Sequence, residues 1–269
     1  MISEEYYFEI SKRFGAIKRA RGTFFYTEKG IRLTDLYLEN GRAVLGWGND
    51  NGTNGTSAFL KIKNNINRGL TGSFETDFSR QLDKAVSDLL NADCKAFVFF
   101  DKEKLQKAAL SVSEKLVTYI PWRNCVCDDK TVSDFECVSI VPPLPWTENL
   151  YILAVKSDIT AFFSSEKISG ALKSGIARSI YDLIAELPRR LEKNWFLYDN
   201  VLQDYFIRKG PYLYSKINEA DYDDFVRHCL DCNLAVSPAF DIPSIVPYGA
   251  DKGVFNLLKN NPWKKGCDL

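Results

Sequence analysis

The chain has 269 residues, 45% of them hydrophobic, which is enough for one substantial core or two small domains. Lys plus Arg equals Asp plus Glu at 35 each, so the formal net charge is zero and exerts no long-range pull on phosphate backbones or anionic lipid. This balance excludes nucleic acid and membrane surfaces as default partners, although it leaves room for a local patch. The longest apolar runs are strand-sized, well short of the ~20 residues that span a bilayer.

The start of the chain and its cysteines indicate a cytoplasmic protein. Residues 1–6 are acidic and polar and lack the basic start and apolar run of a secretory signal. The cysteine count of seven is odd, so we expect reduced thiols. Cys229 and Cys232 form a C-x-x-C in a helical context, and His228 is the sequence's one histidine. Because a zinc site needs four suitably spaced ligands, we expect no structural metal.

Two strands joined by a tight turn are predicted near the start. Residues 23–27 are aromatic and β-branched, and residues 31–36 alternate apolar and polar, as a half-buried strand does. Gly30 can supply the positive φ that the turn requires. The stretch 46–55 is rich in Gly, Asn and Asp and is predicted to be a loop.

The middle of the chain predicts helices and strands in alternation. A helix over 79–90 and a second over 102–117 flank an apolar strand at 96–100. After an irregular, proline-containing region at 121–148, a strand is predicted at 150–155 and a long helix at 166–187. Such alternation is typical of an α/β layer.

The last third predicts a small α+β unit. Residues 211–217 are strand-like, and Asp221 is a plausible N-cap for a helix through Cys232. Asn233 can end that helix in the left-handed conformation. A short strand at 234–236 and a helical turn at 254–259 complete the prediction.

The N-terminal hairpin carries a resemblance to a known family. Residues 19–30, Arg-Ala-Arg-Gly-Thr-Phe-Phe-Tyr-Thr-Glu-Lys-Gly, resemble the opening hairpin of the class III aminotransferases, and Asp35 stands where the second strand of that hairpin ends in Asp. Residues 44–50 resemble the family's Leu-Gly-His-Gly-His-Pro, with Trp47 and Asn49 at the two His positions. The order of later elements is also similar, and 222–238 resembles the C-terminal helix and strand of the glutamate-semialdehyde aminomutase branch.

The resemblance implies an α/β fold of the pyridoxal-phosphate-transferase type, as in aspartate aminotransferase, in reduced form. Family members are typically longer, and the missing length falls between Leu116 and Leu150. The implied large α/β domain, residues 70–187, would hold a mostly parallel sheet. The small α+β domain would combine residues 1–69 and 188–269. Such folds normally dimerise, so a homodimer is expected.

The cofactor chemistry of the family depends on features that this chain lacks. A loop of small residues must offer backbone N–H groups to the cofactor phosphate at a helix N-terminus. Where the family has Ser-Gly-Ser-Glu-Ala, residues 101–105 read Asp-Lys-Glu-Lys-Leu, and two carboxylates there repel a dianion. The family also stacks an aromatic on the ring, and residues 105–116 contain none.

Two further roles have only fallback residues. An Asp must hold the pyridine nitrogen protonated. Asp128, after a short apolar run, is the fallback for this role, although an exposed loop acid is the simpler reading. A Lys must form the Schiff base. The implied position precedes Leu150, where Lys130 is available, and Lys156 is the fallback if the register differs.

Three hypotheses follow. The favoured one is an aminotransferase-like protein that has lost pyridoxal-phosphate binding and catalysis, and that acts as a binding or regulatory homologue of an unknown small-molecule or protein ligand. The alternative is a divergent pyridoxal-phosphate-dependent aminotransferase or aminomutase using Lys156 or Lys130. The third is an unrelated α/β domain.

Overall fold

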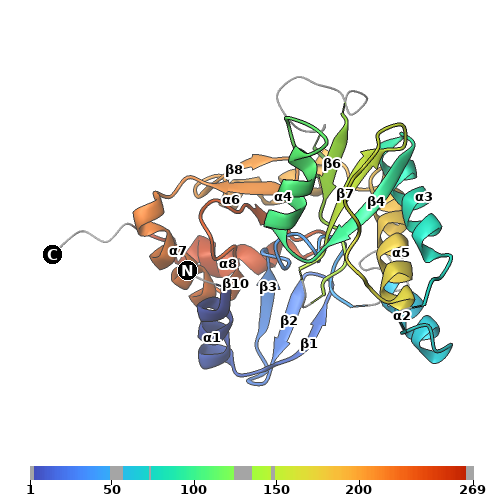
Figure 1. The fold of residues 1–269 in the computed structure, drawn as a ribbon. Coiled ribbons are helices and arrows are strands. Elements are labelled where there is room, and N and C mark those ends of the chain that lie inside the picture. Colours follow the sequence, from blue (N-terminus) through green and yellow to red (C-terminus); the bar gives the residue numbers. More distant parts are fainter. Residues whose placement is uncertain (1–2, 49–56, 73, 124–134, 147–148, 265–269) are drawn as a thin grey trace. The chain divides into compact units, whose positions relative to one another are not determined.

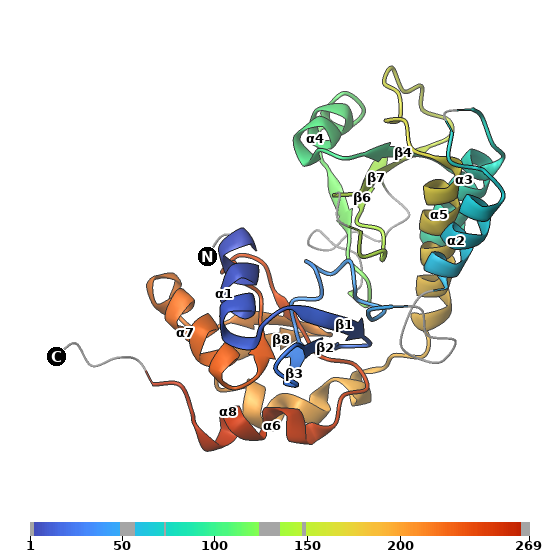
Figure 2. The ribbon, with the colours of Figure 1, turned by 90° about the horizontal axis from the view of Figure 1, so that it is seen from below.

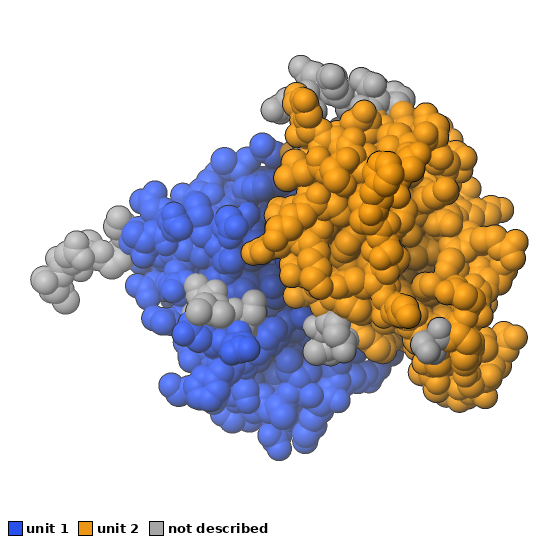
Figure 3. Space-filling view, viewed as in Figure 1, with its two compact units in different colours: residues 1–55, 190–269 blue, residues 56–189 orange. Residues whose placement is uncertain are grey.

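The computed structural model describes residues 3–48, 57–72, 74–123, 135–146 and 149–264, and these form two compact units. Unit 1 comprises residues 1–55 and 190–269, and unit 2 comprises residues 56–189 (Figure 3). The predicted domain boundary lay at residue 70, whereas helix α2 (Ala58–Asn67) groups with unit 2 because it packs on helix α5 (Gly170–Glu186). The assignment of the units as a large and a small domain stays a prediction.

The predicted N-terminal hairpin is confirmed in unit 1. Strands β2 (Phe24–Thr27) and β3 (Arg32–Asp35) pair antiparallel, and Gly30 between them has φ 77°. Strand β1 (Ile17–Arg21) adds to β2 on one side, and β10 (Leu234–Ala235) pairs parallel with β3 on the other (Figure 1). The resulting sheet therefore joins segments from both ends of the chain.

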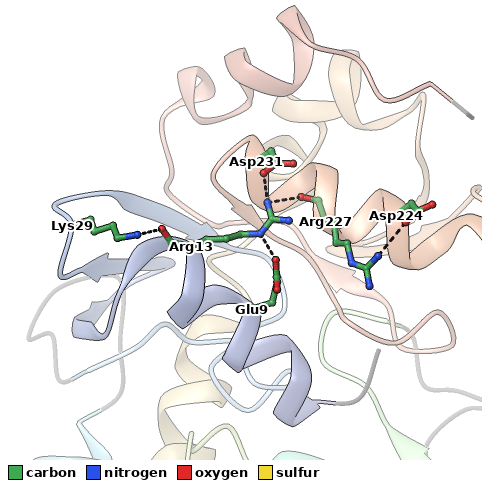
Figure 4. Close-up of polar contacts among 6 residues, drawn as sticks. All are labelled: Glu9, Arg13, Lys29, Asp224, Arg227 and Asp231. Carbon is green, nitrogen blue, oxygen red and sulfur yellow. Dashed lines mark hydrogen bonds and ion pairs between the residues drawn. The ribbon is translucent and has the colours of Figure 1, made fainter.

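Helix α1 (Ser3–Phe14) precedes this sheet and was not predicted. Tyr6, Ile10 and Phe14 recur every four residues and are buried, so one face of the helix lies in the core. Arg13 ties α1 to helix α7 (Glu219–Asp231) through the Asp231 carboxylate (Figure 4). Its Nε also donates to Glu9 Oε1 over 2.7 Å.

Helix α7 forms the centre of the remaining core of unit 1. It begins at Glu219 after Asn218, two residues before the predicted N-cap Asp221, because Asn218 still has an extended backbone with ψ 148°. Its end is as predicted, with Asn233 in the left-handed conformation at φ 60°. Unit 1 also contains a sheet of β8 (Phe206–Lys209), β9 (Tyr212–Ser215) and β11 (Ser244–Ile245). Its short helices are η2 (Glu192–Asn194), η3 (Phe196–Tyr198), α6 (Asp199–Leu202), η4 (Lys252–Phe255) and α8 (Asn256–Asn260).

The sheet of unit 2 has the order β4-β7-β6-β5. Strands β4 (Cys94–Phe99), β6 (Cys137–Ile140) and β5 (Val117–Tyr119) run in one direction, and β7 (Tyr151–Lys156) runs against them between β4 and β6. Three strands thus share a direction, but only the β5–β6 pairing is parallel. The predicted mostly parallel sheet is corrected in this respect, since strand pairing is not encoded by the apolar runs that located the strands.

Helices cover both faces of this sheet. Helices α2, α3 (Phe78–Leu90) and α5 share one apolar cluster with the first face, and α4 (Lys102–Leu110) packs on the other (Figure 2). The α2 and α5 backbones approach closely, since a Cβ added at Gly175 would lie 2.4 Å from Ile62 Cγ1. In the described part of the chain, no helix is both long and apolar enough to cross a membrane.

Two helices of unit 2 are shorter than predicted. Helix α4 ends at Leu110 instead of residue 117, because the Ser111 hydroxyl donates to Ala108 O over 2.7 Å and closes the last turn. Helix α5 begins at Gly170 instead of residue 166, with the Ser169 side chain accepting from Leu172 N–H. Before it, Ser165 and Glu166 lie against the edge of β4, where Glu166 N–H donates to Val98 O over 2.9 Å.

Candidate cofactor site

The end of β4 and the start of α4 are where the resemblance places a phosphate-binding loop. Asp101 is the N-cap residue of α4, and its Oδ1 accepts from Glu103 N–H over 2.7 Å. A carboxylate at this position satisfies a helix N–H group that would otherwise point outward and also complements the helix dipole. The chain therefore supplies its own anion at the place where an external phosphate would bind.

A second carboxylate closes the turn that precedes α4. Glu166 Oε2 accepts from Phe100 N–H over 2.5 Å, and its Oε1 is paired with Lys104 Nζ at 2.8 Å. The Lys104 ammonium lowers the pKa of Glu166, so the carboxylate is ionised at neutral pH. The adjacent residue holds the strand edge as well, since Ser165 Oγ accepts from Val98 N–H over 2.9 Å.

These contacts do not suit a phosphorylated ligand. A phosphate dianion at the α4 N-terminus would meet the carboxylates of Asp101 and Glu166 and would compete with both for backbone N–H groups. The side chain of Lys104, which lies in the first turn of α4, is already paired with Glu166. The described residues of this turn therefore do not fit the phosphate of pyridoxal phosphate.

Lys156 lies at the other end of the sheet. In the antiparallel β4–β7 pair it is opposite Cys94, the first residue of β4, whereas Asp101 lies two residues beyond Phe99, the last. The strand between them places the two ends roughly 17 Å apart at about 3.3 Å per residue. The Lys156 Nζ is directed onto the ring of Phe135, 5.3 Å from its centroid. Lys156 and the α4 N-terminus therefore cannot hold the two ends of one pyridoxal phosphate.

The connection from β6 to β7 is at the same sheet end as Asp101, because Ile140 pairs with Ile152. It spans residues 141–150 and carries three prolines and no lysine. Leu144 and Leu150 within it are fully buried. This connection therefore supplies packing and no amine. The other fallback residues, Asp128 and Lys130, lie outside the described residues.

Asp35, placed by the resemblance at the end of the hairpin, is a buried carboxylate in unit 1. Its Oδ1 accepts from the N–H groups of Tyr37 and Leu38, both over 2.9 Å, and its Oδ2 accepts from Trp47 Nε1 over 2.7 Å. It fixes the entry to a left-handed turn in which Leu38, Glu39 and Asn40 all have positive φ. Asp35 therefore positions the backbone of this turn. In the motif of residues 44–50, Trp47 donates to Asp35, whereas Asn49, at the second His position, lies outside the described residues.

Burial raises the pKa of Asp35 to about 6, against the three N–H donors, which favour its ionised form. The pKa of Asp35 is therefore higher in the folded protein than in the unfolded chain. Its protonation stabilises the fold fully below about pH 4, and this stabilisation is lost as the pH rises through 6. We therefore expect the free energy of unfolding to increase by about 1 kcal/mol from pH 7 to pH 5 relative to Asp35→Asn, which cannot titrate. Urea titrations of both proteins at the two pH values measure this, and parallel pH profiles would contradict it.

The remaining motif residues are structural in the described part of the chain. His228 Nε2 is 2.8 Å from the carbonyl oxygen of Asn261, and Cys232 Sγ is 3.8 Å from the same nitrogen. Cys229 and Cys232 are buried thiols, and burial raises the pKa of each. Among the described residues there is no group of three or more side chains suited to a metal.

Comparisons with known proteins place this geometry in a fold family. No protein-family model matches the sequence. An uncharacterised protein of Treponema pallidum (strain Nichols) is 24% identical, with 91% of this chain and 92% of that protein covered. An uncharacterised protein of Borreliella burgdorferi is also 24% identical, with 90% and 88% covered. Both likenesses extend over nearly the whole chain and assign no activity.

Solved structures give the fold. The ornithine aminotransferase of Plasmodium yoelii superposes with a TM-score of 0.63 at 12% identity, covering 96% of this chain and 97% of that one. The acetylornithine aminotransferase of Elizabethkingia anophelis gives 0.64 at 10% identity, covering 96% and 98%. The ornithine aminotransferase of Toxoplasma gondii gives 0.65 at 8% identity, covering 96% and 94%. The predicted fold is thereby confirmed, and this chain has the α/β fold of the pyridoxal-phosphate-dependent aminotransferases in a reduced form.

Proposed function

We propose that this protein is a non-catalytic aminotransferase homologue that has lost pyridoxal-phosphate binding and acts by binding another molecule. The observation that carries the proposal is the turn from β4 into α4, where Asp101 and Glu166 occupy backbone N–H groups that a cofactor phosphate would need. We further propose a cytoplasmic homodimer, by analogy with the fold. Membership of the aminomutase branch remains a prediction from the resemblance.

The alternative is a divergent enzyme that uses Lys156 or Lys130. The distance along β4 argues against Lys156 acting together with the α4 N-terminus, because the two are at opposite ends of the strand. An enzyme of this kind would have to bind the cofactor phosphate elsewhere. It would also need a neutral amine close to the ring, since a Schiff base forms from the unprotonated lysine.

Incubation of the purified protein with pyridoxal phosphate distinguishes the two. We expect no saturable visible absorption band and no lysine that borohydride labels in preference to the others. Exposed lysines react weakly with any aldehyde, so Lys84→Ala on the surface of α3 serves as the background control. A saturable band that is abolished by Lys156→Ala or Lys130→Ala, but not by Lys84→Ala, would refute the proposal and support the enzyme.

A further inference from the structure

The outer face of the β1–β2–β3 sheet combines arginine and aromatic side chains. Residues of one face alternate along each strand, and Phe25 and Leu33 are buried on the inner face. The neighbouring positions Arg19, Tyr26 and Arg32 therefore lie on the outer face, where the two arginines are exposed and the tyrosine is half-buried.

The strand register arranges these side chains in two rows. In the first row, Arg19 on β1 is opposite Tyr26 on β2, which is opposite Arg32 on β3. In the second row, Arg21 is opposite Phe24. Within the first row, the Arg19 guanidinium carbon is 5.5 Å from the Tyr26 ring centroid. The Arg32 guanidinium carbon connects the two rows, since it is 4.6 Å from the Phe24 ring centroid.

The charge of this face has one sign. Arg19, Arg21 and Arg32 are all exposed, and the three strands contain a single carboxylate, Asp35, which is buried. The zero net charge of the whole chain excludes a long-range field, but it does not prevent a local excess of positive charge where Arg19 and Arg32 lie on the same face of the sheet. Such a face attracts an anionic partner at short range.

We propose that this face binds single-stranded nucleic acid. A cationic sheet that carries partly exposed aromatic rings binds the phosphate backbone through its arginines and stacks unpaired bases on its rings. Phe24 and Tyr26 are two residues apart on β2, so their rings are spaced at about 6.6 Å, within the reach of successive bases of an extended strand. An acidic protein would use the arginines alone, and a duplex buries its bases, so the aromatic rings favour a single strand.

Binding of fluorescein-labelled oligonucleotides of about 12 nucleotides, dT and rU, measures this directly by fluorescence anisotropy. We expect binding that weakens between about 50 and 200 mM salt, as phosphate contacts require. Tyr26→Leu and Phe24→Leu should each weaken binding by at least about fivefold, through loss of a stacked base. Arg19→Gln and Arg32→Gln should each reduce the slope of log affinity against log salt by about 0.7.

Matched control variants test whether the effects of charge and of aromatic rings are specific to this face of the sheet. Arg80→Gln removes an arginine from α3 whose side chain is 88% exposed, and Phe8→Leu removes a ring of α1 that is 70% exposed, so neither should change binding. Tyr26→Phe keeps a ring and should retain full affinity, which distinguishes lost stacking from a misfolded sheet.

Two results would overturn the proposal. One is a dissociation constant weaker than about 100 μM at low salt, because even non-specific binding to nucleic acid reaches that affinity. The other is binding that polyglutamate displaces as well as an oligonucleotide does and that Tyr26→Leu and Phe24→Leu leave unchanged, because the face would then be a site for an acidic protein. Neither result depends on whether pyridoxal phosphate binds.

Discussion

Phe225→Ala is expected to lower the free energy of unfolding by about 3–5 kcal/mol, the range for a fully buried aromatic truncated to alanine. The Phe225 side chain is completely inaccessible to solvent. Its ring centroid is 5.4 Å from that of Tyr205, 5.6 Å from that of Phe206 and 5.8 Å from that of Trp263. Loss of the ring leaves a cavity among rings that come from separate segments, so the surroundings cannot collapse to fill it.

Urea titration followed by near-UV circular dichroism measures the effect. Phe8→Ala is the matched control, because Phe8 is 70% exposed on α1 in the same unit and should change the free energy of unfolding by less than about 0.5 kcal/mol. Equal effects of the two substitutions would show that Phe225 is not in the core.

Asp35→Ala is expected to cost about 2–4 kcal/mol. The substitution removes the acceptor of three N–H groups, those of Tyr37, Leu38 and the Trp47 indole, and a buried donor without an acceptor costs about 1–3 kcal/mol. The left-handed turn that begins at Leu38 also loses the acceptor that holds it, and release of its backbone strain, about 1–2 kcal/mol per non-glycine residue, offsets part of the cost. Relief of the buried charge offsets part of this loss.

The indole N–H resonance of Trp47 provides a local test. In the wild type it should be protected from solvent exchange, and in Asp35→Ala it should exchange faster as the loop opens. Glu28→Ala, at the exposed turn of the same hairpin, should leave both the stability and that resonance close to the wild type. A Trp47 resonance that is unprotected in the wild type would contradict the hydrogen bond itself.

The predictions from sequence were best where one local rule determines the structure. The 23–36 hairpin needed only alternating residues and Gly30, and both are present in the structure. Helix α1 was missed because its acidic, polar opening conceals a four-residue spacing of Tyr6, Ile10 and Phe14. Helix α2 was missed because its inner face includes Asn65, a buried amide that donates to Ser174 Oγ over 2.6 Å and interrupts the apolar stripe.

In the candidate site too, contacts between residues close in sequence could be predicted, whereas contacts between distant segments could not. The carboxylates of residues 101–105 indicated a poor phosphate loop, and the capping role of Asp101 agrees with the preference of Asp for helix N-termini. The contribution of Glu166 could not be predicted, because it reaches Phe100 from 66 positions along the chain and belongs to a segment predicted as helix. Likewise, only the strand register revealed that Lys156 and Asp101 lie at opposite ends of β4.

The pairing of β10 with β3 sets an order for folding during synthesis. Leu234 pairs with Thr34, which lies 200 positions earlier in the chain. Unit 2 is one continuous stretch, so it can complete its core while the ribosome is still adding residues beyond 189. The edge of β3 cannot pair with β10 until β10 has been synthesised. Until then its unpaired backbone N–H and C=O groups can pair with strands of other chains. Arrested nascent chains that end before β10 should therefore depend on chaperones more than those that include it.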